Sequence, residues 1–245
     1  MPIQYDGRKI IRHNVINYNA YKEYEEKQIR EDRRLSDQRK KQLSKDSYEE
    51  WIRWCPENFR NASIESIGNH DPDVMNTLYE VVRTSKNTGR PQSLIIGSHE
   101  QRLREGVIRP KGKTWAMYAY ISELCKEHII TDPINEVYMM DEYTMMDKNT
   151  DWRDNGRFMD EVFDTKHKII IIDNINSDAG VMKRKKYGDD AWGRFVNAAD
   201  GKNVAIVMLF SGNYDDMSLK GVKEKTDKLM QNAPKAILTQ GVSSI

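Results

Sequence analysis

Four consecutive isoleucines followed by a carboxylate, Ile169 to Ile172 and then Asp173, most constrain how this chain can fold. An uninterrupted β-branched run is typical of a strand that is buried on both of its faces. Such strands occur in parallel sheets that helices cover on both sides. A polar residue at the carboxyl end of the strand lies where open α/β sheets collect their ligands. The run therefore predicts an α/β domain with a site at one edge of its sheet.

Three other short apolar runs also predict buried strands, and helical patterns separate these four strands from one another. They begin near residues 93, 137 and 204. Helices are expected over 113–128 and 157–163, and a further one after Asp71-Pro72, where a favoured N-cap precedes a proline at the first helical position. Strands that alternate with helices predict a mostly parallel sheet with covering helices.

The segment before this domain has a different composition. Residues 18–54 are crowded with Lys, Arg, Glu and Gln, contain no Gly or Pro, and predict one or two exposed helices. Most of these charges can simply form a solvated face. The apolar seam is thin, so a partner protein is an alternative cover for it. The seam consists of Tyr21, Tyr24, Ile29, Leu35 and Leu43.

Two tryptophans, Trp51 and Trp54, end this segment just before Cys55-Pro56, and the proline favours a helix boundary there. We therefore expect a helical partner-binding segment over 1–55 and an α/β domain over 56–245. Trp51 and Trp54 are its candidate partner-binding anchors. The rival interpretation is that both tryptophans pack on the domain and the segment is a structural arm.

Charge and cysteine content restrict the classes of function. Charged residues make up 31% of the chain, but the formal net charge is only +1, so a chain-wide basic surface for nucleic acid is excluded. The two cysteines are far apart and support neither a disulfide framework nor a zinc site. No apolar run approaches the ~20 residues that span a bilayer. We expect a cytoplasmic protein without a membrane partner.

A candidate phosphate site lies at the start of the helix expected over 113–128. Residues Pro110, Lys111, Gly112, Lys113, Thr114 and Trp115 are its candidate nucleotide-binding residues. In a P-loop, glycines let the backbone wrap the phosphates, the Lys meets the β- and γ-phosphates, and the Thr hydroxyl meets Mg²⁺. Here the first glycine is displaced, because Gly106 precedes Gly112 by one residue too many and an insertion occupies 98–109. A Gly-Lys-Thr at a helix start also occurs by chance.

Two strand ends supply the other parts that ATP and Mg²⁺ require. Asp173 is a candidate metal ligand together with Thr114, and a candidate catalytic residue together with Asn213, which follows the strand near 204. Either residue can instead just form a turn. Asn174 stands where a hydrolytic enzyme of this type usually carries an acid, and an amide cannot accept a proton. The sequence therefore favours ATP binding over hydrolysis, with a weak ATPase at most.

From Pro56 onward the chain resembles the AAA+ helicase loaders of the DnaC/DnaI type and, less specifically, the IstB transposition helpers. The resemblance covers about three-quarters of the chain and rests on residues 94–97, 112–114, 169–173 and 209–213 together with Pro56 and Phe59. It implies a P-loop AAA+ core that binds ATP and single-stranded DNA. It also implies that the segment before Pro56 holds a hexameric replicative helicase, which is delivered onto single-stranded DNA during replication initiation. An IstB-like helper, or a degenerate P-loop scaffold without ATPase activity, is the alternative.

Local basic clusters are the candidate nucleic-acid contacts. Lys183, Arg184, Lys185 and Lys186 precede Tyr187, and four cations beside an aromatic side chain could follow a phosphate backbone and stack a base. A solvated basic loop is an equal alternative. The arginines of the 98–109 insertion could clamp phosphates or meet a neighbouring subunit. No arginine follows Arg194, so the arginine finger that the resemblance implies is missing.

Overall fold

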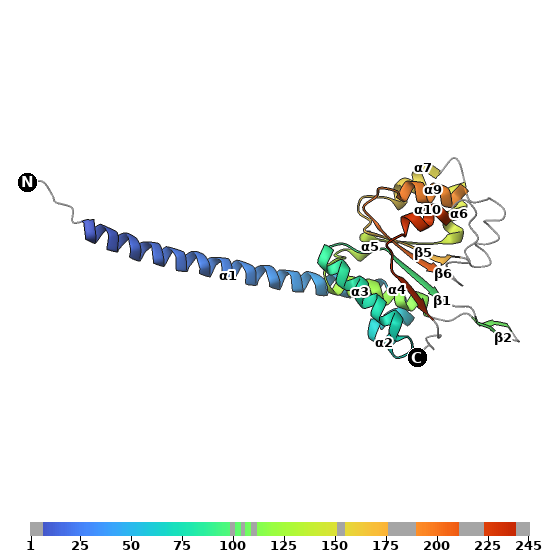
Figure 1. Ribbon diagram of the computed structural model, residues 1–245, viewed down its shortest axis with the longest axis horizontal. Coiled ribbons are helices and arrows are strands. Elements are labelled where there is room, and N and C mark those ends of the chain that lie inside the picture. Colours follow the sequence, from blue (N-terminus) through green and yellow to red (C-terminus); the bar gives the residue numbers. More distant parts are fainter. Residues whose placement is uncertain are drawn as a thin grey trace, which may run out of the picture. The chain divides into compact units, whose positions relative to one another are not determined.

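The computed structural model describes residues 7–98, 101–103, 106–108, 112–150, 155–175, 190–210 and 223–238. The chain divides into two compact units, Met1–Leu43 and Ser44–Ile245. The second unit contains an α/β domain, as Figure 1 shows. No helix in the described ranges is both long and apolar enough to span a bilayer.

A five-stranded sheet in which every neighbouring pair is parallel forms the centre of the α/β domain. Its strand order is β4-β5-β6-β1-β7. The strands are β1 (Leu94–Ser98), β4 (Val137–Asp141), β5 (Ile169–Ile175), β6 (Ala205–Phe210) and β7 (Lys235–Leu238). The four strands expected from the sequence and their parallel arrangement are confirmed, and β7 is an additional edge strand.

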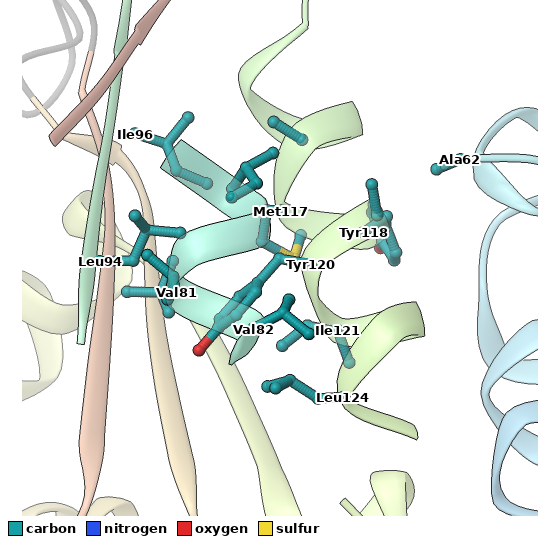
Figure 2. Packing of buried hydrophobic residues seen from close by; sticks show 14 of the residues in the cluster. Ala62, Val81, Val82, Leu94, Ile96, Met117, Tyr118, Tyr120, Ile121 and Leu124 are labelled. Carbon is teal, nitrogen blue, oxygen red and sulfur yellow. The ribbon is translucent and has the colours of Figure 1, made fainter. Parts of the chain in front are cut away.

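Alternate residues of the central strands enter two separate cores, one on each face of the sheet. Ile169 and Ile171 belong to one cluster, whereas Ile170 and Ile172 belong to the other, and all four are fully buried. This two-sided burial explains the unbroken isoleucine run. The first cluster includes side chains from α2 (Ile64–Gly68), α3 (Pro72–Thr88) and α4 (Lys113–Lys126), and Figure 2 shows part of it. The second includes side chains from α6 (Glu142–Thr150), α7 (Asn155–Val162) and α9 (Asp190–Ala199).

Short elements connect these layers. They are η1 (Glu57–Phe59), α5 (Pro133–Glu136) and α10 (Lys223–Leu229). The 98–109 insertion contains an antiparallel pair of strands, β2 (Gln101–Leu103) and β3 (Gly106–Ile108). The predicted start of α3 is confirmed, because the Asp71 side chain accepts a hydrogen bond from the Val74 N–H at 3.3 Å. Gly89 ends this helix in the left-handed conformation with φ 67°.

The expected helical N-terminal segment is a single helix, α1 (Gly7–Trp54). In the first unit, the seam residues are exposed to 46–65%, as expected for a helix whose surface is polar nearly all round. The last part of α1 belongs to the second unit, where Ser44, Ser47 and Trp51 bond to α4 and to the residues after it. The division of the chain into units therefore falls before the boundary that we expected at Pro56.

Candidate functional site

Polar residues converge at the carboxyl edge of the sheet. Ser98 ends β1, Asp141 ends β4, and Asp173 lies near the end of β5. Asp141 and Asp173 are register partners on adjacent parallel strands, so their side chains leave the same face of the sheet. This is the edge at which the isoleucine run predicted a site.

The start of α4 provides backbone N–H groups at this edge. Gly112 is its N-cap, with φ 140° and ψ −16°, a conformation that side-chain-bearing residues rarely adopt. Its carbonyl accepts the Ala116 N–H at 2.7 Å, which closes the first helical turn. Gly112 has no side chain with which to cap the helix, so the first N–H groups of α4 suit an anion, which the helix dipole also favours.

Lys113 connects this helix start to two strand ends. Its Nζ donates a hydrogen bond to the Ser98 hydroxyl at 3.3 Å, and Ser98 is buried at the end of β1. Its ammonium charge also acts on Asp173, where it partly offsets the rise that burial causes in the pKa of that carboxyl. Two residues that lie sixty positions apart in the sequence therefore share one electrostatic environment, as ATP–Mg²⁺ binding requires.

The ionisation of Asp173 is opposed by its surroundings. Burial raises the pKa of its carboxyl above the usual 3.8, and the neighbouring Asp141 raises it further. The Asn174 N–H, which donates to Asp173 Oδ1 at 2.6 Å, and the Lys113 ammonium act in the opposite direction. A bound cation would favour the ionised form. The described residues contain no cluster of three His, Cys, Asp or Glu, so a cation here would depend on one or two carboxylates and on phosphate oxygens, as Mg²⁺ commonly does.

Asn174 occupies an irregular position in β5. It has φ 56°, in the left-handed region, and the pairing of β5 with β6 shifts register between Ile172 and Ile175. Asn tolerates this conformation better than most residues with a side chain. A glutamate here would therefore cost about 1–2 kcal/mol, the general penalty for a left-handed residue. The backbone gives a reason why Asn, rather than a catalytic acid, follows Asp173.

Asp141 is a second acid at this edge that the sequence analysis missed. Its Oδ1 accepts the Thr144 N–H at 2.6 Å and so caps α6. The next residue, Glu142, is fully buried and accepts a hydrogen bond from Trp192 Nε1 at 2.8 Å, which gives it a structural contact. The signal in the sequence is the same as for Asp173, because Asp141 also ends an apolar strand of the sheet.

Comparison with known proteins supports the fold. No protein-family model matches the chain, and no curated protein sequence matches it. The crystal structure of the DnaC helicase loader matches with a TM-score of 0.50 and 11% sequence identity, over 75% of this chain and 100% of that chain. The chain therefore has a fold similar to that of the DnaC helicase loader. The replication initiator DnaA, bound to AMPPCP and single-stranded DNA, matches with a TM-score of 0.46 and 14% identity, over 72% of this chain and 49% of that chain.

Two more predicted P-loop residues, Thr114 and Trp115, lie in the first turn of α4. Thr114 is partly buried beside Lys113, and its role as a metal ligand stays a prediction. The Trp115 side chain is directed elsewhere, because its Nε1 donates to the Ser66 hydroxyl at 2.8 Å and its ring meets Phe59 edge-on at 6.3 Å. Trp115 can therefore serve a phosphate only through its backbone N–H.

The remaining site predictions lie outside the described residues. They are Pro110, Lys111, Lys183, Arg184, Lys185, Lys186 and Asn213. The nucleotide contacts of the first two, the nucleic-acid contacts of the basic cluster and the catalytic role of Asn213 remain predictions.

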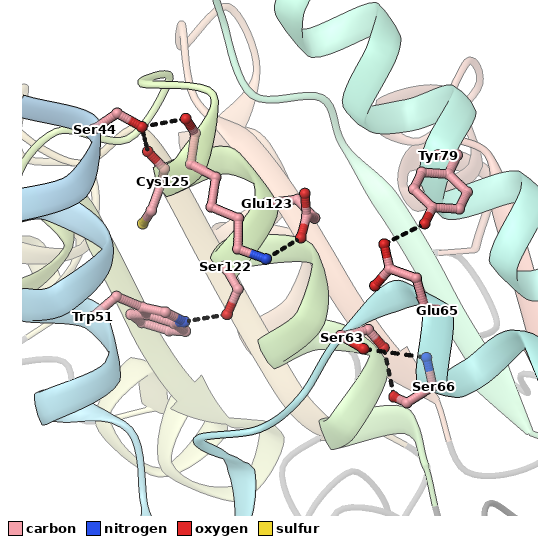
Figure 3. A network of polar contacts seen from close by, with 10 residues as sticks. Ser44, Trp51, Ser63, Glu65, Ser66, Tyr79, Ser122, Glu123 and Cys125 are labelled. Atoms are coloured by element: carbon pink, nitrogen blue, oxygen red, sulfur yellow. Dashed lines mark hydrogen bonds and ion pairs between the residues drawn. The ribbon is translucent and has the colours of Figure 1, made fainter. Parts of the chain in front are cut away.

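The two tryptophans expected to bind a partner have different environments. Trp51 is fully buried and donates from Nε1 to the Ser122 hydroxyl at 3.0 Å (Figure 3). Its ring lies 5.4 Å from the Tyr118 ring. Trp54 is 42% exposed and stacks on Trp51 at 5.1 Å. Trp51 is thus part of the core of the α/β unit, because its ring is buried there and its N–H is hydrogen-bonded. Only Trp54 retains a surface that a partner could contact.

Proposed function

We propose that this chain binds ATP with Mg²⁺ and loads a hexameric replicative DNA helicase onto single-stranded DNA. One observation carries the nucleotide part of this proposal. The Lys113 ammonium acts on the Asp173 carboxyl at the edge of the sheet where α4 begins, although the two residues are far apart in sequence. The DnaC-type fold supports the loading part.

Each residue of the edge has a defined task in this proposal. The N–H groups after Gly112 and the Lys113 ammonium hold the phosphates, while Thr114 and Asp173 hold the cation. Mg²⁺ would neutralise the charge of the β- and γ-phosphates and bridge them to the protein. Lys113 is already held toward the strand ends by its bond to Ser98, so little reorganisation is needed when phosphate binds.

Hydrolysis is proposed to be slow. Asn174 cannot accept a proton from water, and the chain has no arginine after Arg194 that would act as a finger on a neighbouring nucleotide. An ATP-gated binding protein, rather than a fast ATPase, fits these residues best. The cytoplasm of a bacterial host is the compartment in which such a loader works.

The nucleotide site is tested by Lys113→Ala, measured with a fluorescent ATP analogue or by calorimetry. We expect at least a hundredfold loss of affinity, because the substitution removes the phosphate-facing charge. Lys126→Ala is the matched control, since Lys126 lies at the other end of α4 and pairs with Glu123 on the surface. Unchanged affinity in Lys113→Ala would overturn the assignment.

The loading role is tested separately with purified proteins. The full-length chain should co-elute with a replicative helicase and promote its transfer to single-stranded DNA in the presence of ATP. Capture of a transposase in place of the helicase would select the IstB-like alternative. A chain that binds no nucleotide would be a degenerate P-loop scaffold.

A further inference from the structure

A cavity lies at the amino edge of the sheet, opposite the edge that carries Lys113 and Asp173. Its volume is about 460 Å³. It is lined by residues 89–93, which connect α3 to β1, by Lys168, which precedes β5, and by residues 202–205, which lead into β6. A cavity of this size can hold a small organic ligand. We call it the amino-edge pocket.

Basic side chains dominate the amino-edge pocket. Arg90, Lys168 and Lys202 line it, and none of its described lining residues is acidic. Lys168 is neutralised by Glu136, with 2.8 Å between Nζ and Oε1. Arg90 and Lys202 are not neutralised in this way. Arg90 bonds to a neutral amide. The backbone N–H of Lys202 donates to the Ala199 carbonyl at 3.0 Å, but its side chain forms no hydrogen bond or ion pair with any residue that the structure describes.

The C-termini of α3 and α9 face this edge and oppose part of that charge. Each helix end contributes about −0.5 of an elementary charge. Two such ends offset about one of the two unneutralised cations, so roughly one positive charge remains for a ligand. The pocket therefore stays electropositive in a chain whose formal net charge is only +1.

The neutral side chains of the pocket also have hydrogen-bond donors that can bind a ligand. The Arg90 Nη1 donates to Asn203 Oδ1 at 2.9 Å, which leaves the amide N–H groups of Asn203 for another acceptor. The Ser93 hydroxyl accepts the Ile206 N–H at 3.0 Å, so its own proton can be donated. A ligand that satisfies these groups must be an acceptor and must carry negative charge.

The loops that present the cations are held in place. Arg90 follows Gly89 and Lys202 follows Gly201, and both glycines have left-handed φ angles, 67° and 74°. The Arg90–Asn203 bond joins the two loops. Gln92 exchanges two backbone hydrogen bonds with the Tyr120 hydroxyl, at 2.9 and 3.1 Å, and Tyr120 is fully buried. This order lowers the entropy cost of binding.

We propose that the amino-edge pocket binds a phosphate group, with Arg90 and Lys202 as its charged contacts and Ser93 and Asn203 as neutral donors. A guanidinium matches the geometry of phosphate oxygens, and an ammonium adds a point charge. The phosphate can belong to a nucleic-acid backbone or to a free phosphate compound. The site is independent of the ATP site, because it lies at the other edge of the sheet.

The test uses the full-length chain carrying Lys113→Ala, so that the ATP site does not contribute. The substitution Lys202→Glu is added to it, because Lys202 is exposed and its replacement breaks no bond to a described residue. Arg157→Glu, on the exposed surface of α7, is the matched control with the same change of charge. Binding of inorganic phosphate is followed by NMR, and binding of a labelled oligothymidylate by fluorescence anisotropy at several salt concentrations.

We expect Lys202→Glu to weaken at least one of these ligands tenfold or more and Arg157→Glu to change neither by more than twofold. Loss of oligothymidylate binding, with the slope of log K against log salt reduced by about one, identifies a nucleic-acid backbone. Loss of phosphate binding alone identifies a free phosphate compound. Equal affinity of Lys202→Glu and Arg157→Glu for both ligands, or no binding of either ligand before substitution, overturns the proposal and leaves Arg90 and Lys202 as cations that only offset the helix ends.

Discussion

Asp173 is ionised when it binds a cation, but the protonated form is the one that stabilises the ligand-free fold. Burial and Asp141 raise the pKa of its carboxyl in the folded chain, so the folded state holds this proton more tightly than the unfolded state does. The contribution of this carboxyl to the free energy of unfolding is fully present below its pKa in the unfolded chain. It is lost as the pH rises through its pKa in the folded chain. Asp173→Asn should therefore raise the melting temperature of the ligand-free protein at pH 7, and the difference should vanish as the pH falls toward 3.8. Thermal unfolding across this pH range measures the difference in melting temperature. Equal melting temperatures of the two proteins at pH 7 would contradict the prediction.

Asp141 is the carboxylate best placed to accept a proton near Asp173, since Asn174 cannot. Asp141→Asn should lower the slow ATP turnover at least about a hundredfold, the lower end of the 10²–10⁴ range of general-base effects, and leave nucleotide affinity within about threefold. The helix cap should survive, because Asn caps helices about as well as Asp. Steady-state phosphate release measures turnover, with Asp160→Asn on α7 as the control. Wild-type turnover in Asp141→Asn would exclude this role.

Within α1, the two tryptophans should differ in their effect on stability. Trp51→Ala removes a fully buried indole and its bond to Ser122, and large-to-small core substitutions of this kind cost about 3–5 kcal/mol. Trp54→Ala removes a partly exposed ring that stacks on Trp51, and about 1 kcal/mol or less is expected beyond its lost burial. Urea unfolding compares the two variants. Equal losses would show that the end of α1 does not pack on the core as described.

The sequence predicted those elements in which apolar residues follow one clear pattern over the whole element. The isoleucine run and the strand starts near 93, 137 and 204 predicted β1, β4, β5 and β6, because strands buried on both faces read as unbroken apolar runs. The edge strand β7 was not predicted, since its burial alternates over only four residues. The sequence suggests a partner protein for Trp51 because the helix around it is polar. In the fold its indole N–H instead donates to Ser122, which lies seventy-one residues away on α4. Sequence patterns report local burial, whereas such distant pairings appear only in the fold.

The α/β unit begins at Ser44 and includes the last part of α1. Ser44 donates to the Lys126 carbonyl, and Ser47 donates to the Ile130 carbonyl at 2.7 Å (Figure 3 shows the Ser44 contact). The unit therefore loses core contacts if the chain is cut at Pro56, the boundary that the sequence indicated, but keeps them if it is cut at Ser44. The position of the first residue should decide whether a shortened chain folds.

A chain that begins at Ser44 should remain folded and bind an ATP analogue within about threefold of the full-length affinity. A chain that begins at Pro56 loses Trp51 and should be less stable by at least ~3 kcal/mol, a large part of the 5–15 kcal/mol that holds a typical domain together. Urea unfolding and analogue titration measure both effects. The exposed seam of α1 is absent from both chains, so both should lose helicase binding if that seam is the docking surface. A chain beginning at Ser44 that still captured helicase at full affinity would place the docking surface on the α/β unit, because nothing of the first unit would remain to bind it.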